Sequence, residues 1–322
     1  MTATLRGGLA TAACLALALA PLGGCRPSDS APAANATAPK PPLRLVVMDP
    51  LAAQLACDCV AGFAQRKYGG LARFLEARLA RDVRIAFGES LAQVLRRHPG
   101  KPDLIVGKRS VVIHDAAAAR LPIRPIALLT GPDGRTTLTG LFVVRTADKA
   151  RRIADLAGRT ILLGPPDCDE KHAAALAALK AAGVAPPKRP RISPSCSSAA
   201  LDVVEKKADA AVVSSYAMPL LEGCGTIDKH ALRIIGRSPP VPFVTAFVTD
   251  AVSAGQERDI LAALRAVHTD AGLLKAMESK SGFLPVGPAA AAPGPGGSCI
   301  PAGPAAGTAR CPHTGLAPSG TG

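Results

Sequence analysis

The sequence contains no tryptophan and two tyrosines, so aromatic side chains make up only 3% of its 322 residues. It also lacks any block of five or six like charges, although its formal net charge is +14. Proteins that bind nucleic acid commonly stack bases on aromatic side chains, or concentrate basic charge in runs. We therefore expect a basic protein without a nucleic-acid partner.

A long apolar run is missing as well, because the run at residues 9–21 is too short to span a membrane. Arg6 precedes this run, and small residues lead from it to Cys25, as in a bacterial lipoprotein signal. We predict that residues 1–25 are a signal peptide with its lipid-modified cysteine. The alternative is a plain secretory signal, with Cys25 as an ordinary thiol. The expected location is extracytoplasmic in the cell envelope, with the lipid anchor as the only membrane contact.

Two segments have the composition of disordered chain. Residues 26–42 are rich in Pro, Ala, Ser and Asn and predict a tether, and residues 287–322 are an Ala/Gly/Pro tail. The chain between them is long enough for two lobes of ordinary domain size, each with its own core.

Cysteines are the reactive residues that stand out. Nine are present, and seven remain when Cys14 and Cys25 are set aside: Cys57, Cys59, Cys168, Cys196, Cys224, Cys299 and Cys311. An exported protein forms disulfides by default, and an odd number leaves at least one thiol that is free or bound otherwise.

Apolar strands alternate with amphipathic helices along the central region. Strands are predicted at residues 43–48, 83–87, 103–107, 126–129, 160–163 and 210–213, with helices between them. Residues 138–144 and 240–248 are predicted to be extended crossings. This alternation favours an α/β fold with mostly parallel, doubly wound sheets.

The densest group of chemically active side chains lies at Asp167–His172, directly after the strand at 160–163. Asp167 and Asp169 could simply cap the following helix, with Lys171 and His172 solvated. Cys168 is not a capping residue, so capping does not account for it. Ligands of open α/β sheets bind at the carboxyl ends of strands, which favours a functional role for this turn.

Five segments, in order, resemble the phosphate/phosphite/phosphonate-type substrate-binding proteins of ABC importers. They are YGGLARFLE at 68–76, PDLIVG at 102–107, LFVV at 141–144, IADLAGR at 153–159 and RSPPVP at 237–242. The resemblance covers about residues 43–285. It implies a two-lobed type II periplasmic-binding-protein fold with a hinge of two crossings. Lobe 1 would be residues 43–137 plus 240–286, and lobe 2 residues 138–239.

The same resemblance implies a monomeric receptor that binds a small ligand, an oxyanion such as phosphate or phosphonate, between its lobes and delivers it to an ABC permease. The family's ligand-binding loops correspond to several loops of this chain, and we add residues that neighbour them. The expected ligand-binding residues are Lys108, Arg109, Ser110, Thr136, Thr137, Asp167, Cys168, Asp169, Lys171, His172, Cys196, Ser197, Ser214, Ser215 and Tyr216.

The acidic turn departs from the hydroxyl-and-glycine cluster of phosphonate binders, and two hypotheses address its thiol. In the first, Cys168 pairs with Cys196, and a second bridge, through Cys224, holds the loop of Cys57 and Cys59. In the second, copper or zinc binds among Cys57, Cys59, Cys168, His172 and Cys196. No other cofactor is expected.

An enzyme is the remaining class. Cys168 at a helix start near His172 could act as a nucleophile or a redox thiol. The acidic neighbours of Cys168 disfavour its thiolate, and the resemblance points to binding. We therefore expect a solute-binding lipoprotein and no enzyme, with a metal receptor or thiol redox protein on the same fold as the alternative.

Overall fold

The computed structural model describes residues 40–55, 65–186 and 189–287. The predicted signal peptide with Cys25, nearly all of the predicted tether, the tail from residue 288, and Cys57 and Cys59 lie outside these residues. Within them, no helix has the length and apolarity needed to cross a bilayer.

The first sheet has six strands in the order β13-β4-β12-β3-β1-β2. Its strands are β1 (Leu43–Met48), β2 (Val83–Phe87), β3 (Leu104–Lys108), β4 (Ile123–Leu129), β12 (Val244–Thr249) and β13 (Phe283–Pro285). Strands β2, β1 and β3 are parallel, whereas β12 runs antiparallel to both β3 and β4. The sheet is therefore doubly wound, with one long return strand inserted from the far end of the chain.

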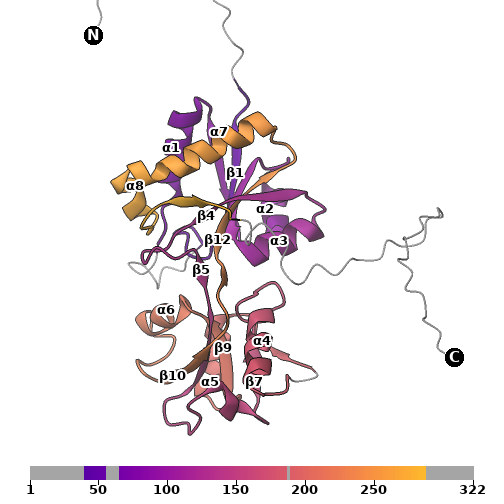
Figure 1. Ribbon diagram of the computed structural model, residues 1–322, viewed down its shortest axis with the longest axis vertical. Helices are drawn as coiled ribbons and strands as arrows, with labels where there is room; N and C mark the ends of the chain where they lie inside the picture. The colour runs from indigo at the N-terminus through magenta and orange to yellow at the C-terminus, as the bar shows by residue number, and fades with distance from the viewer. Residues whose placement is uncertain (1–39, 56–64, 187–188, 288–322) are drawn as a thin grey trace, which may run out of the picture. The chain divides into compact units, whose positions relative to one another are not determined.

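Alternate residues of β1 enter two different cores, as the period of a strand requires. Leu45 and Val47 pack on the side of α1 (Tyr68–Leu79), α7 (Ala254–Arg265) and α8 (Ala271–Ala276). Val46 and Met48 pack on the side of α2 (Leu91–Arg97) and α3 (Arg109–Ala118). Figure 1 shows these two helix layers on opposite faces of the sheet.

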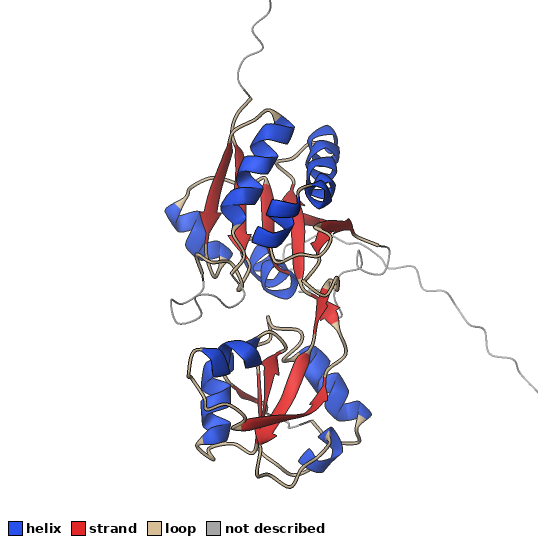
Figure 2. Cartoon of the chain, turned by 90° about the vertical axis from the view of Figure 1, so that its left-hand side faces the viewer, coloured by secondary structure: helices blue, strands red, loops and turns tan. Residues whose placement is uncertain are grey.

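The second sheet has five strands in the order β10-β6-β9-β7-β8. Its strands are β6 (Gly140–Arg145), β7 (Ile161–Leu163), β8 (Arg191–Ile192), β9 (Ala210–Ser214) and β10 (Leu232–Arg237). Leu141 and Val143 of β6 face α5 (Cys196–Val204) and α6 (Ala217–Gly223). Phe142 and Val144 face α4 (Ala173–Ala181) and the short helix η2 (Ile153–Leu156), so this sheet is also covered on both faces (Figure 2).

The chain passes between the two sheets twice, and the two passages pair with each other. Strand β5 (Thr137–Leu138) is antiparallel to β11 (Val241–Pro242), with Thr137 opposite Pro242. The predicted crossings begin in this ladder, but most of each continues as β6 or β12 inside a sheet. The predicted two-lobed type II α/β fold is confirmed.

Three helix ends are set by local contacts. Neither Asp167 nor Asp169 caps α4, because the chain makes turns through His172 and the N-cap position falls on that residue. Helix α5 begins at Cys196, since the side chain of Ser195 accepts from Ser198 N and caps the helix there. Helix α7 continues into a 3-10 turn, η3 (Ala266–Thr269).

Candidate functional site: a cavity at the strand ends

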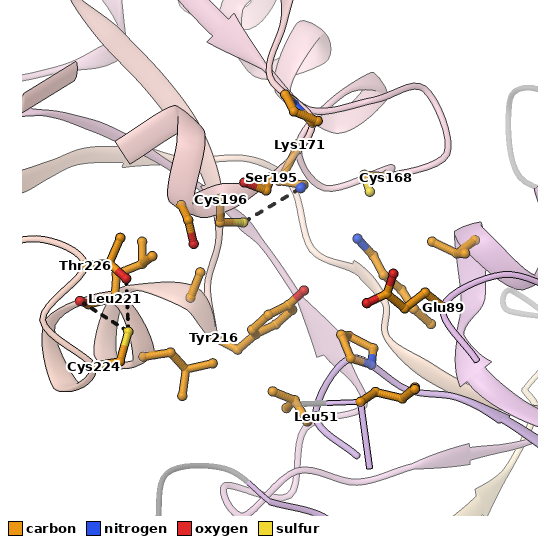
Figure 3. Close-up of a pocket in the computed structure, with 18 of the residues that line it drawn as sticks. Leu51, Glu89, Cys168, Lys171, Ser195, Cys196, Tyr216, Leu221, Cys224 and Thr226 are labelled. Carbon is orange, nitrogen blue, oxygen red and sulfur yellow. Dashed lines mark hydrogen bonds between the residues drawn. The ribbon is translucent and has the colours of Figure 1, made fainter. Parts of the chain in front are cut away.

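A cavity of about 560 Å³ lies where the carboxyl ends of strands from both sheets meet. The loops after β1, β2 and β3 supply one wall, and those after β7, β8 and β9 supply the other. This is the edge at which open α/β sheets bind ligands. Its lining residues are Met48, Pro50, Leu51, Leu55, Glu89, Lys108, Val111, Cys168, Lys171, Pro194, Ser195, Cys196, Ser197, Tyr216, Ala217, Leu220, Leu221, Cys224 and Thr226 (Figure 3).

The wall after β1 is held in place by the buried carboxylate of Asp49. Its Oδ2 accepts from Arg66 Nη1 at 2.8 Å and from Tyr68 Oη at 2.6 Å, and its Oδ1 accepts from the backbone of Leu51. A buried carboxylate is stable only when its oxygens are matched by donors in this way. The apolar lining residues Pro50 and Leu51 therefore stand on a fixed loop.

Tyr216 connects this wall to the second sheet. Its ring stacks on the ring of Phe243, with the centroids 5.5 Å apart. The guanidinium of Arg66 also lies over the Phe243 ring. Burial raises the pKa of Tyr216, so the phenol is protonated at neutral pH. It therefore faces the cavity as a neutral aromatic wall.

A buried ion pair crosses between the two sheets beside the cavity. Lys108 Nζ lies 2.7 Å from Glu170 Oε1, which also accepts from Ser214 Oγ at 2.5 Å. Burial raises the pKa of Glu170, but the Lys108 ammonium and the Ser214 hydroxyl outweigh burial and leave this pKa below its ordinary value. Burial likewise lowers the pKa of Lys108, and Glu170 reverses the effect. Both groups are therefore charged at neutral pH.

Gly140, at the start of β6, allows the backbone of Glu170 to pack closely against this strand, in the position where Glu170 pairs with Lys108. A Cβ on Gly140 would lie 2.1 Å from the backbone oxygen of Glu170 and 2.7 Å from Val212 Cγ1. Any side chain at residue 140 would push the backbone of Glu170 away from β6. The start of β6 therefore positions the carboxylate that Lys108 meets.

Lys171 presents a second buried ammonium, which lines the cavity as Lys108 does. Its side chain is only 5% exposed, and no ion pair of the described residues includes it. The hydrogen bond recorded for its Nζ goes to Cys196 Sγ, at 3.7 Å (Figure 3). A thiol is a weak acceptor. Glu170 attracts this ammonium through space, but no carboxylate of the described residues contacts it.

The N-terminus of α5 opens on the same cavity through Ser195, Cys196 and Ser197. The first backbone N–H groups of a helix have no partner within it and carry partial positive charge. Together with the Lys171 ammonium they form an electropositive corner. Such a corner suits the oxygens of a small anion.

The structure brings six of the predicted ligand residues to the cavity wall and leaves nine elsewhere. The six are Lys108, Cys168, Lys171, Cys196, Ser197 and Tyr216. The other nine do not line it: Arg109, Ser110, Thr136, Thr137, Asp167, Asp169, His172, Ser214 and Ser215. Ser214 acts on the site indirectly, through Glu170.

The predicted bridge between Cys168 and Cys196 is not present. Both are free thiols, as is Cys224, although all three line the cavity. The Lys171 amine is hydrogen-bonded to the sulfur of Cys196, as Figure 3 shows. Cys168 and Cys196 therefore line the same cavity without forming a disulfide.

The metal hypothesis also fails within the described residues. No group of three or more His, Cys, Asp or Glu side chains there could hold a metal ion. The His172 ring does not line the cavity, because its Nδ1 is hydrogen-bonded to the carbonyl oxygen of Gly164 at 2.8 Å. Cys57 and Cys59 lie outside the described residues.

Sequence reasoning missed Glu89, Ser195 and the role of Glu170. Glu89 follows the end of β2, so the rule applied to the other loops would have found it. Ser195 precedes the helix as an N-cap residue, which is a readable signal. Glu170 lies in the predicted acidic turn, and nothing local indicates that its partner is Lys108, 62 residues away.

Residues 63–290, well over half of the chain, match the family described as "ABC transporter, phosphonate, periplasmic substrate-binding protein". No curated protein sequence matches the chain significantly. The three solved structures described next are 13–18% identical to this chain and bear on the fold alone.

Three of them illustrate the likeness. A Xanthomonas citri protein solved with bound ATP has a TM-score of 0.58 at 18% identity, covering 78% of this chain and 93% of that one. The binding component of a phosphonate ABC transporter from Pseudomonas aeruginosa has a TM-score of 0.56 at 17% identity, covering 76% and 81%. PhnD1 of Prochlorococcus marinus, in complex with methylphosphonate, has a TM-score of 0.55 at 13% identity, covering 77% and 93%. The chain belongs to the family of periplasmic substrate-binding proteins of phosphonate-type ABC transporters.

Proposed function

We propose that this protein is a lipid-anchored receptor that binds a small organic oxyanion in the cavity at the strand ends and delivers it to an ABC permease. One observation carries the choice of ligand charge. Lys171 holds a buried ammonium against the cavity with only a thiol as its hydrogen-bond partner. Glu170 attracts this ammonium through space but does not contact it, so an anion that enters the cavity can form a direct, charge-assisted hydrogen bond with Lys171.

The second ammonium, Lys108, is already matched by Glu170, at 2.7 Å. Lys171 is then the one lining cation of the described residues that no carboxylate contacts, which favours a ligand head with a single negative charge over a doubly charged one. The opposite wall carries an apolar patch of Pro50, Leu51 and Leu55, with the exposed carboxylate of Glu89 beside it. We infer that an organophosphonate monoanion, or a similar small organic acid, suits the cavity better than inorganic phosphate does.

The family membership supports this class of ligand, and one solved relative contains methylphosphonate. The proposed role is binding and delivery by a monomer, without catalysis and without a nucleic-acid partner. The lobes are proposed as residues 43–137 plus 240–286 and residues 138–239. The proposed anchor, Cys25, would hold the receptor at the membrane.

Titration calorimetry with methylphosphonate and with phosphate tests the proposal. We expect methylphosphonate to bind more tightly, and Lys171→Met to weaken it at least about tenfold, or about 1.4 kcal/mol. Lys180→Met, on the exposed last turn of α4, is the matched control and should bind as the wild type does. Equal affinity in the Lys171→Met protein would refute the role of this ammonium.

A further inference from the structure

Anion binding leaves unexplained why three free thiols line one cavity. They belong to different elements: Cys168 to the loop after β7, Cys196 to the first turn of α5, and Cys224 to the end of α6. The nucleophilic form of cysteine is the thiolate, so the groups that face each sulfur decide which one reacts.

Two of the three thiols have no N–H donor hydrogen-bonded to their sulfur among the described residues. Burial raises the pKa of Cys168, although the ammoniums of Lys108 and Lys171 act in the opposite direction. Cys224 Sγ lies 3.8 Å from the carbonyl oxygen of Leu221 and 3.0 Å from Thr226 Oγ1. A carbonyl can only accept a hydrogen bond, so the Cys224 thiol is the donor in its contact with Leu221.

Cys196 has donors aimed at its sulfur instead. Lys171 Nζ lies 3.7 Å from Sγ and the backbone N–H of Ser214 lies 3.4 Å from it. Ser214 Oγ, at 3.8 Å, can accept from the thiol, and it donates its own proton to Glu170. Cys196 is also half-buried and opens a nine-residue helix. Electropositive, partly exposed positions of this kind are where reactive cysteines occur.

Lys171 adds an observation that points to a ligand at this sulfur. It is a buried ammonium on the cavity wall, and its recorded acceptor is Cys196 itself. A small molecule that seats a negative group on Lys171 would hold its neighbouring atoms beside Cys196 Sγ. If those atoms include a disulfide, the ion pair between Lys171 and the negative group holds this disulfide next to the Cys196 sulfur.

We propose that Cys196 is a covalent capture site for small anionic disulfides, which form a mixed disulfide with it by thiol–disulfide exchange. The Cys196 thiolate attacks one sulfur of the small disulfide, its S–S bond breaks, and the other half leaves as a thiolate that takes up a proton. The small disulfide is itself the oxidant, so no further electron acceptor is needed. The inference rests on the proposed anion site, since both use Lys171.

The test exposes the full chain to three small disulfides of similar size and different charge. They are dithiodiglycolate with two carboxylates, neutral hydroxyethyl disulfide, and cystamine with two ammoniums. Peptide mass spectrometry reports the rate of adduct formation at each cysteine separately. We expect Cys196 to react at least about tenfold faster than Cys168 or Cys224, with the anionic reagent fastest and the cationic one slowest.

Variants at Lys171 separate charge from packing. Lys171→Arg keeps the charge and should keep the order in which the three reagents react. Lys171→Met should make the three reagents react with Cys196 at similar rates. Equal rates at the three cysteines, equal rates for the three reagents, or an order unchanged in Lys171→Met would each overturn the capture site. Near-ultraviolet circular dichroism verifies that both variants are folded.

Calorimetry of the unmodified wild type with methylphosphonate distinguishes this inference from the proposed function. Methylphosphonate binding without selective capture at Cys196 overturns the capture site alone. Selective, charge-dependent capture without methylphosphonate binding supports the capture site and counts against the proposed choice of ligand.

Discussion

The ammonium of Lys108 lies 2.7 Å from Glu170 Oε1, and this buried pair joins the end of β3 in one sheet to the loop after β7 in the other. Lys108 is 4% exposed and Glu170 is fully buried. The second carboxylate oxygen, Oε2, is buried and has no hydrogen-bond partner among the described residues. The pair therefore depends on one oxygen that accepts from both Lys108 and Ser214.

Removing one charge of this pair should destabilise the protein strongly. We expect Glu170→Gln to lower the free energy of unfolding by about 3 kcal/mol, because it leaves the Lys108 ammonium buried without a counter-charge. Urea unfolding measures the difference. The double variant Lys108→Met/Glu170→Leu should recover most of the loss, since it removes both charges of this pair.

An exposed ion pair gives the matched control. Lys101 Nζ lies 2.6 Å from Asp250 Oδ1, and both side chains are more than two-fifths exposed. Pairs in water contribute little, so Lys101→Gln should leave the melting temperature almost unchanged. If Glu170→Gln were as mild as Lys101→Gln, the cross-sheet pair would have no structural importance.

The stabilising effect of Glu170 should depend on pH in a defined direction. Its pKa in the folded protein is held below the ordinary value of about 4.3 in an unfolded chain. Its contribution is therefore complete above about pH 5, and is lost as the pH falls below about 4.3 through the folded pKa. The difference in unfolding free energy between the wild type and Glu170→Gln, measured from pH 7 to pH 3, should shrink toward acid. A difference that widened toward acid would contradict this assignment.

Gly140→Ala tests whether the close approach at the start of β6 positions Glu170. The new methyl group would meet the backbone oxygen of Glu170 and the side chain of Val212. We expect a loss of about 1–3 kcal/mol of stability from overpacking, measured by urea unfolding. Weaker anion binding should accompany it in calorimetry, because Lys171 follows Glu170 directly.

Gly69→Ala is the control for the glycine substitution itself. Gly69 lies in the first turn of α1, and the nearest atom to an added Cβ is Arg73 Nη1, at 3.8 Å. Alanine there should be neutral or stabilising by up to about 1 kcal/mol, because it favours the helix. If both alanine variants had the same stability, crowding at Gly140 would not matter.

The paired crossings are predicted to act as the hinge of ligand-driven closure. Thr137 and Leu138 of β5 pair with Pro242 and Val241 of β11, and the lobes should move as rigid bodies about this ladder. Small-angle scattering should show a smaller radius of gyration with a saturating concentration of the anion that binds in calorimetry. An unchanged radius would argue against closure.

The local sequence pattern is enough to predict the alternation of strands and helices and the edge of the sheets at which the chemically active residues lie. Periodic apolar residues mark the strands, and polar residues follow each strand end whatever the packing. For this reason local pattern is enough to predict Lys108, Lys171, Cys196 and Tyr216 at one edge. The helix start at Ser195 is also local, because its hydroxyl caps a backbone N–H three residues on.

Which of those side chains contact one another depends on the packing of whole elements in the folded chain. Lys108 and Glu170 are 62 residues apart, and nothing local distinguishes Glu170 from the acids of an ordinary first turn. Whether the cysteines pair is likewise a matter of tertiary packing. Cys168 and Cys196 line one cavity, but the Lys171 side chain contacts Cys196, and no bond joins the two sulfurs. A residue's place along a strand or loop follows from local periodicity. Its partner follows from how whole elements pack, and that is a property of the assembled fold.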